Sequence, residues 1–274
     1  MPSRRTAGAT VVLVTGVMCA VAAMPATAAT AATALTPTRP VAGAAVPAAP
    51  TTAAPCPLPA FGPGRSYRPR IERAGFTAHV TNPYFPLVAG RTMIYAGVKD
   101  GKRALNVVVV TAHTRRVDGV VTRVVEDRLY LNAVLEERTR DYYAQDRCGN
   151  VWYFGEDTAT LDARGRVTSR DGSFLAGVHG AQPGVFMQAH PQVGRWFRQE
   201  WAPGQAEDTF RVVRLSGAVT VPYGSYRRAL RTQERTALEP GVVDVKFYVR
   251  GLGEVYEGSV SGPKEQLRLV EIIR

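Results

Sequence analysis

The stretch PLVAGR at residues 86–91 recurs as PQVGR at residues 191–195, and its two prolines lie 105 positions apart. Each copy leads into an aromatic-bearing segment with a strand pattern. Further landmarks recur in the same order at nearly the same spacing: Gly119 and Gly224, DYY at 141–143 and KFY at 246–248, GNVW at 149–152 and GEVY at 253–256. The chain is therefore predicted to contain one structural unit written twice, at about 82–160 and 187–274.

The segments between these landmarks have the composition of β-strands. They are short, rich in β-branched and aromatic residues, and mostly separated by Gly, Asp or Asn. The sequences KDGK at 99–102 and VDGV at 117–120 are hairpin signals. We expect a mainly β fold, in which antiparallel meanders in two related halves form a curved sheet, a half-barrel or a barrel-like single domain.

The N-terminal region indicates export. Two arginines precede a long apolar run that ends in an A-x-A cleavage pattern, so residues 1–28 are predicted to be a signal peptide. The sequence leaves open whether the general or the twin-arginine route is used. Residues 29–60, almost entirely Ala, Thr and Pro, are predicted to form a disordered tether, and residues 61–274 a single β domain.

Cysteine usage agrees with an exported protein. Cys19 falls in the signal peptide, which leaves Cys56 and Cys148 as an even pair that predicts a disulfide. By the chain-entropy model, such a bond stabilises the fold by about 4 kcal/mol. We expect a secreted or extracytoplasmic protein, and the sequence leaves association with the cell wall open.

The chain is basic, with a formal net charge of +11. Residues 1–60 contain three arginines and no acid, so the remainder carries +8. A basic exported protein suits a lipid or an anionic envelope polymer as partner, with solubility as the plainer reason for the charge. Nucleic acid is not expected, because no reader motif is found and basic residues are scattered among acids. No transmembrane segment is expected in the mature protein, and the oligomeric state is undecided.

Two pairs of adjacent acids supply the candidates for catalysis. Glu156-Asp157 and Glu207-Asp208 follow aromatic strand segments at loop edges. Paired carboxylates can bind a hard cation or act as general acid and base on a sugar. Adjacent acids at loop edges are more often hydrated or paired with Arg, however, so no catalytic residue is assigned and a non-enzyme is the favoured interpretation.

Aromatic and histidine side chains are the candidates for ligand contacts. Adjacent aromatic residues in a strand face both sides of the sheet, so one set can line a cavity while the other joins the core. The Gly- and Pro-rich segment 174–194 is either a lid or cavity wall, or a simple crossover between the halves. The candidate ligand-binding residues are Trp152, Phe154, Trp196, Trp201, His179 and His190.

No metal or cofactor is expected. The chain has no C-x-x-C pair, and two histidines eleven positions apart without a third ligand make a weak zinc case. No phosphate-binding glycine loop, calcium loop, dinucleotide fingerprint or nucleophile elbow is found.

Several motifs resemble those of uncharacterised secreted bacterial proteins of the actinobacterial type. They are NPYFPL at 82–87, YYAQD at 142–146, GNVWYFGE at 149–156 and VPYG at 221–224. This resemblance implies a place in a family and no particular activity. In architecture the chain is distantly similar to lipoprotein-carrier (LolA/LppX-like) domains, whose curved sheets hold acyl chains.

These features lead to three hypotheses. The first is an exported non-catalytic binding protein that holds an apolar or amphipathic envelope ligand in a sheet concavity. The second is a secreted hydrolase that acts on a wall or extracellular polymer through paired carboxylates. The third is a structural or partner-binding domain without a small ligand.

Overall fold

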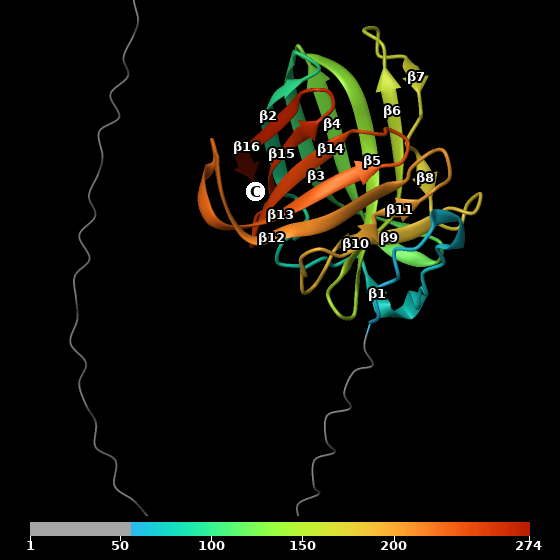
Figure 1. Cartoon of the computed structure of the whole chain (residues 1–274). Helices are drawn as coiled ribbons and strands as arrows, with labels where there is room; N and C mark the ends of the chain where they lie inside the picture. The colour runs from blue at the N-terminus through green and yellow to red at the C-terminus, as the bar shows by residue number, and fades with distance from the viewer. Residues whose placement is uncertain (1–55) are drawn as a thin grey trace, which may run out of the picture. The chain divides into compact units, whose positions relative to one another are not determined.

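The computed structural model describes residues 56–274, which form an almost all-β unit (Figure 1). Thirteen strands follow one another in a single antiparallel sheet that curls into a nearly closed barrel, and three further short strands pair beside this path. Two short 3-10 helices, η1 (Gly64–Ser66) and η2 (Arg73–Gly75), are the only helices in this part of the chain. The predicted mainly β, antiparallel, barrel-like fold is confirmed.

The first meander forms one half of the barrel wall. Each of its strands pairs antiparallel with the next. The turns at 100–101, 118–119 and 132–133 each have positive φ at both residues, the conformation of type I′ hairpin turns that Asp-Gly and Asn favour. The strands are β2 (Thr92–Lys99), β3 (Lys102–Val117), β4 (Val120–Leu131), β5 (Val134–Asp146) and β6 (Val151–Leu161).

The second meander forms the other half and joins the first through its last strand. Its strands are β12 (Asp208–Val221), β13 (Gly224–Thr236), β14 (Val243–Val249), β15 (Gly253–Ser261) and β16 (Glu265–Ile273). The C-terminal strand β16 pairs with β2 from Glu265 opposite Lys99 to Ile273 opposite Thr92. The two meanders therefore make one continuous wall, although their sequences are far apart at this joint.

The connecting segment closes the barrel at its seam. β10 pairs with β12, whereas β11 pairs with β9, which in turn pairs with β6. Since only Gln199 separates β10 from β11, this short piece touches both edges of the sheet. The segment contains β7 (Val167–Ser169), β8 (Phe174–Leu175), β9 (Gln182–Met187), β10 (Trp196–Arg198) and β11 (Glu200–Trp201).

A β-bulge in the first meander turns two nearby side chains to the inside. The pairing of β5 with β6 shifts register between Tyr142 and Tyr143. A bulge inserts one extra residue on one strand and so reverses the inside–outside alternation beyond it. Tyr153 and Glu156, three residues apart, consequently both line the interior.

The second meander has the same irregularity at the place that the sequence repeat aligns with the first. The pairing of β14 with β15 shifts register between Phe247 and Tyr248, and Glu254 and Glu257 both line the interior. The two meanders thus share strand order and the position of a bulge. A duplicated unit stays a prediction, which a superposition of the halves would test.

The segment before the first meander packs over β10 and β11. The Arg198 guanidinium lies over the rings of Phe61 and Tyr67, and its Nη2 donates a hydrogen bond to the Gly62 carbonyl oxygen at 3.0 Å. At the end of this segment β1 (Phe76–Thr77) pairs with β5. This part of the chain therefore covers the closure of the barrel from outside.

The predicted Cys56–Cys148 disulfide is confirmed. It joins the start of the covering segment to the turn between β5 and β6. Such bonds persist in oxidising, extracytoplasmic compartments. The expected signal peptide, Cys19 and most of the expected tether lie outside the described residues. Between residues 56 and 274, no helix has the length and apolarity needed to span a bilayer.

Closure of the barrel depends on a glycine. A Cβ at Gly184 of β9 would clash with the carbonyl oxygens of Arg198 and Gln199. We expect Gly184→Ala to lower the free energy of unfolding by about 2 kcal/mol, because the backbone must move apart at the seam. Urea unfolding measures this change. Gly75→Ala is the control, since the nearest atom to its Cβ would lie at 3.5 Å; equal midpoints for the two variants would contradict the close approach.

Candidate functional site

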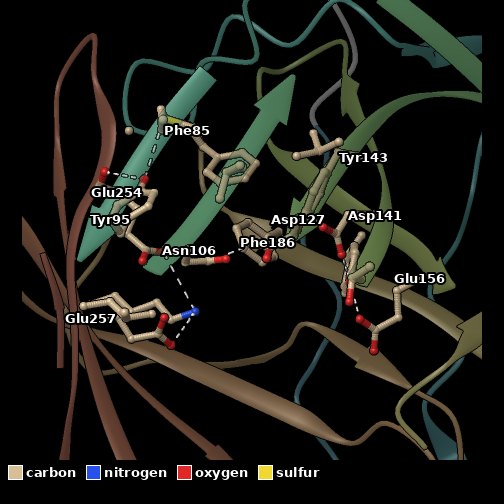
Figure 2. Close-up of a pocket in the computed structure, with 18 of the residues that line it drawn as sticks. Phe85, Tyr95, Asn106, Asp127, Asp141, Tyr143, Glu156, Phe186, Glu254 and Glu257 are labelled. Atoms are coloured by element: carbon tan, nitrogen blue, oxygen red, sulfur yellow. Dashed lines mark hydrogen bonds and ion pairs between the residues drawn. The ribbon is translucent and has the colours of Figure 1, made fainter. Parts of the chain in front are cut away.

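The interior of the barrel holds a chamber of about 330 Å³ (Figure 2). Its lining comes from alternate strand positions, such as Val125, Asp127 and Leu129 of β4, because side chains on a strand face opposite sides in turn. The lining is strongly acidic, with ten carboxylates and two cations. The carboxylates are Asp127, Glu137, Asp141, Glu156, Glu200, Asp208, Glu234, Glu254, Glu257 and Glu265, and the cations are Lys99 and Lys246.

Lys246 of β14 lies among three carboxylates of one wall. Its Nζ is 3.1 Å from an oxygen of Glu257, 3.3 Å from Glu234 and 3.9 Å from Glu254. Burial disfavours the charged ammonium, but the carboxylates outweigh this effect and raise the pKa of Lys246 well above its usual range. One permanent positive charge thus faces three acids, which leaves this wall with excess negative charge when the acids are ionised.

Asp141 and Glu156 lie on the side of the chamber away from Glu257 (Figure 2), and Tyr153 bridges their carboxyl groups. Its hydroxyl lies 2.5 Å from Asp141 Oδ1 and 3.1 Å from Glu156 Oε2. A hydroxyl has one hydrogen to donate, so satisfying both contacts requires one of the carboxyl groups to carry a proton. Burial raises the pKa of Asp141 to about 7, and burial together with the nearby Asp141 charge raises that of Glu156 well above its usual range. The pair therefore retains a proton at neutral pH.

Two more acids of the lining, Glu200 and Asp208, lie at the seam of the barrel. The Asp208 backbone N–H donates to Glu200 Oε1 at 2.5 Å. Burial, with the neighbouring Asp208 charge, raises the pKa of Glu200 well above its usual range. Glu200 is buried, whereas Asp208, although protein surrounds much of its carboxyl group, is accessible to solvent at the start of β12. The acidic lining thus extends from the interior to solvent.

The remaining polar contacts leave acceptors facing the chamber. Asn106 Nδ2 donates to Asp127 Oδ2 at 3.1 Å, and the Oδ1 of Asn106 is buried without a partner among residues 56–274. Burial raises the pKa of Asp127 to about 7, with a further contribution from Asp141. Burial raises the pKa of Glu254 to about 8, although Lys246 opposes this shift. Lys99 Nζ pairs with Glu265 at 3.2 Å.

An aromatic cluster forms another part of the lining. The Phe85 ring centroid lies 4.6 Å from that of Phe186 and 5.1 Å from that of Tyr143. Tyr143 stacks on Tyr153 at 4.8 Å. The chamber therefore offers flat apolar surface beside its carboxylates, an arrangement that suits a ligand with both charged and apolar atoms.

Of the four acids proposed from sequence, two line the chamber. Glu156 and Asp208 face inward, whereas Asp157 pairs with Arg170 outside at 2.8 Å and Glu207 accepts a hydrogen bond from the Gly204 backbone at 2.9 Å. Strand alternation separates Glu156 from Asp157, whereas Glu207 precedes β12 and contacts the turn at Gly204. The structure thus brings one acid from each pair to the chamber.

The four aromatic candidates lie elsewhere. Trp152 and Phe154 pack against Phe76, and the Trp152 indole donates to Asp146 at 3.0 Å. Trp196 lies beside Phe61, and Trp201 lies under the Arg198 guanidinium. None of the four is among the residues that line the chamber.

The two histidine candidates are also separate from the chamber. His190 is exposed after β9. His179, which has a positive φ of 50°, lines a second pocket of about 310 Å³ together with Glu156 and Asp157. The segment 174–194 thus forms wall strands and one side of this outer pocket, and Glu156 borders both hollows.

Most of the chamber acids were missed from the sequence, although a local signal marks some of them. In VVEDRLYL at 124–131, Asp127 occupies the same alternating position as the buried Val125 and Leu129. A polar residue in phase with an apolar strand face indicates a polar interior. No local pattern shows that such residues from distant strands meet.

One group of metal-ligand type comes together in the described part of the chain, formed by Cys56, Asp146 and Cys148. Both sulfur atoms belong to the disulfide and so are not available as thiolate ligands.

No protein-family model and no curated protein matches the chain. One solved structure with a similar arrangement is a Bacteroides fragilis protein described as exported, with a YmcC-like fold; it is 13% identical with a TM-score of 0.41, covering 70% of this chain and 99% of that one. Another, described as a lipoprotein of Parabacteroides distasonis, is 8% identical with a TM-score of 0.37, covering 69% and 98%. Likeness at this level says nothing of ligand or activity. The actinobacterial and LolA/LppX-like resemblances stay predictions.

Stability should depend on pH through the chamber acids. The folded-state pKa values of about 7 for Asp127 and Asp141 and about 8 for Glu254 exceed those of unfolded carboxyl groups, near 4. Between about pH 4 and 8 these groups bind more protons when folded, so their contribution to stability is full below about pH 4 and is lost progressively as pH rises to 7 to 8.

We therefore expect urea unfolding to give a lower free energy at pH 8 than at pH 5.5. Asp127→Asn should raise the value at both pH values, and by up to about 2 kcal/mol more at pH 8 than at pH 5.5, since folded Asp127 stays protonated up to about pH 7 while the unfolded carboxyl group is ionised at both pH values. A free energy of unfolding that increases steadily up to pH 8 would show that these carboxyl groups are not buried as described.

Proposed function

We propose that this protein is an exported, non-catalytic binding protein whose chamber holds a small ligand with at least one amine group. The observation that carries the proposal is the excess of ten lining carboxylates over two lysines inside a chain of basic net charge. Those lining groups that are ionised accept hydrogen bonds only, and a cationic donor is the ligand that satisfies them. A secreted or wall-associated location is part of the same proposal.

The acidic lining favours an amine over an acyl chain. An apolar chain would displace water from carboxylates without replacing its hydrogen bonds, which carries a large free-energy cost. An amphipathic ligand is compatible only with its charged end in the chamber, against Asp127, Asp141 and Glu156. The apolar ligand expected from sequence is therefore the less favoured version of the binding hypothesis.

The size of the chamber limits the ligand. At about 30 Å³ for each water-sized group, 330 Å³ holds about eleven such groups. A linear polyamine such as spermidine, or a small amino sugar, has this size. A polymer chain exceeds this volume, and this argues against the wall-polymer hydrolase. Asp208 and Glu200 mark the seam as the path of entry.

Calorimetry with spermidine tests the proposal. We expect binding at pH 8 and weaker binding at pH 5.5, because carboxyl groups with pKa values of about 7 lose their charge between these values. Asp127→Asn should weaken binding about ten-fold, the effect of one lost charged hydrogen bond. Asp157→Asn is the matched control, since this acid faces outside and pairs with Arg170.

Decanoate is the probe for the opposite outcome. Binding of decanoate without binding of spermidine would overturn the amine proposal in favour of an apolar ligand. Equal weakening of spermidine binding by Asp127→Asn and Asp157→Asn would place its site outside the chamber.

One geometry favours a second candidate, hydrolysis of a small substrate. Tyr153 holds an oxygen of Asp141 and one of Glu156 within about 5.6 Å of each other, a limit that includes the separation of about 5–5.5 Å in retaining glycosidases. A proton shared near neutral pH suits general acid–base catalysis. If this candidate is right, the wild-type protein releases nitrophenol from a small nitrophenyl glycoside. Asp141→Asn should lose this activity, and Asp157→Asn should keep it. No release by the wild type would exclude the candidate for that class of substrate.

A further inference from the structure

The outer face of β12 and β13 carries four arginines without acidic partners. Glu234 faces the chamber, so its neighbours in β13 face outside. Among residues 56–274, no carboxylate lies within ion-pair distance of these four guanidinium groups. We call this set the arginine face; it consists of Arg211, Arg214, Arg231 and Arg235.

Two of these arginines are directly opposed in the strand ladder. Arg214 of β12 is the cross-strand partner of Arg231 of β13, and like charges in this position destabilise a sheet. The Nε of Arg231 is buried without a hydrogen-bond partner in the described chain. An anion bound outside would offset the repulsion between the two guanidinium groups.

The first meander also contains two arginines opposite each other, but an acid lies beside them. There Arg128 of β4 opposes Arg138 of β5, but Glu126 lies beside them, 2.6 Å from the Arg128 guanidinium. Glu126 also lies 3.6 Å from Arg140. An acid of the chain neutralises one face, whereas the arginine face lacks such an acid and depends on an external one.

Aromatic rings hold the arginine face in place. The guanidinium carbons of Arg211 and Arg235 lie 4.9 and 5.3 Å from the Trp196 ring centre, and that of Arg231 lies 5.6 Å from the Phe247 ring centre. A guanidinium stacked on a ring can still present the N–H groups of its edge to phosphate. In Arg211, the Nε and Nη2 groups donate to Gln233 Oε1 at 2.9 and 2.7 Å, so its Nη1 is the group left for an anion. The sites are therefore ordered before an anion arrives.

The spacing indicates a polymer. Arg231 and Arg235 are four residues apart in one strand, about 13 Å at roughly 3.3 Å per residue. We propose that the arginine face binds a linear polymer of negatively charged phosphate groups, which can contact arginines that lie this far apart at the same time. This surface is separate from the chamber, and the proposal does not depend on the ligand of the chamber.

A membrane is the less suitable anionic partner. Surfaces that dock on bilayers combine basic residues with apolar side chains that enter the lipid. On the arginine face, guanidinium groups lie over Trp196 and Phe247, so these rings are not free to insert. The apolar neighbours of Arg214 in β12 are Val213, which is partly buried, and Leu215, which is 49% exposed.

Binding of sodium polyphosphate to the full mature chain tests the proposal. If all four arginines each contact one phosphate, the logarithm of the affinity should fall with that of salt concentration with a slope of about −3, at roughly 0.7 per contact. Arg231→Gln with Arg235→Gln should reduce the slope by about half and the affinity about 25-fold at about 0.1 M salt. The matched control is Arg128→Gln with Arg140→Gln, which removes equal charge from the face that contains Glu126 and should change affinity less than about two-fold.

A thermal melt distinguishes lost binding from lost folding. Arg231→Gln removes the opposed like charge, so without polyphosphate it should melt at or above the wild-type temperature, while polyphosphate should raise the wild-type value more. Equal loss of affinity in both double variants would show that binding depends only on the net charge of the protein, and this would overturn the proposal. Binding to phosphatidylglycerol vesicles without binding to polyphosphate would overturn it in favour of a membrane.

Discussion

The pairing of the last strand with the first long strand is the contact on which the architecture depends. β16 and β2 are joined by backbone hydrogen bonds along nearly their whole length, and without them the two meanders would be separate curved sheets with exposed apolar faces. Their union creates an interior that neither half can enclose alone. Pairing between the ends of the domain is non-local and requires most of the chain to be ordered at once, so we expect slow, cooperative folding.

Within that enclosure the protein separates its charges. The chain is basic as a whole, yet its interior surface is acidic and an outer face of the second meander holds arginines without acids. The bulge in β6 places Glu156 on the interior instead of Asp157, and the bulge in β15 adds Glu257 to the inward acids. Lys246 and the raised carboxyl pKa values keep this concentration of charge compatible with a folded wall. The same strands thus present an anionic surface to one side and a cationic surface to the other.

Sequence patterns predict the local structure well and the meeting of distant residues poorly. The Asp-Gly turns and the strand composition predict the antiparallel meanders, and cysteine parity predicts the bond between Cys56 and Cys148. Alternation would also have separated Glu156 from Asp157. Asp141, Lys246 and Asp127 line one chamber only because the barrel closes, and no local sequence pattern encodes that closure. Trp196 and Trp201 are residues of the type that often binds ligands. In the structure, however, arginines and the segment around Phe61 cover their rings.

The disulfide has a mechanical consequence. Cys56 lies before the segment that covers the seam, and Cys148 lies at the turn between two central wall strands. Tension applied to the chain on the N-terminal side of Cys56 therefore passes through a covalent link to the body of the sheet. The covering segment, held by Arg198 and short contacts, bears little of that load and is not peeled from the seam. A protein pulled from its N-terminal side, as one fixed to a surface would be in flowing medium, would keep its chamber closed while the bond is intact.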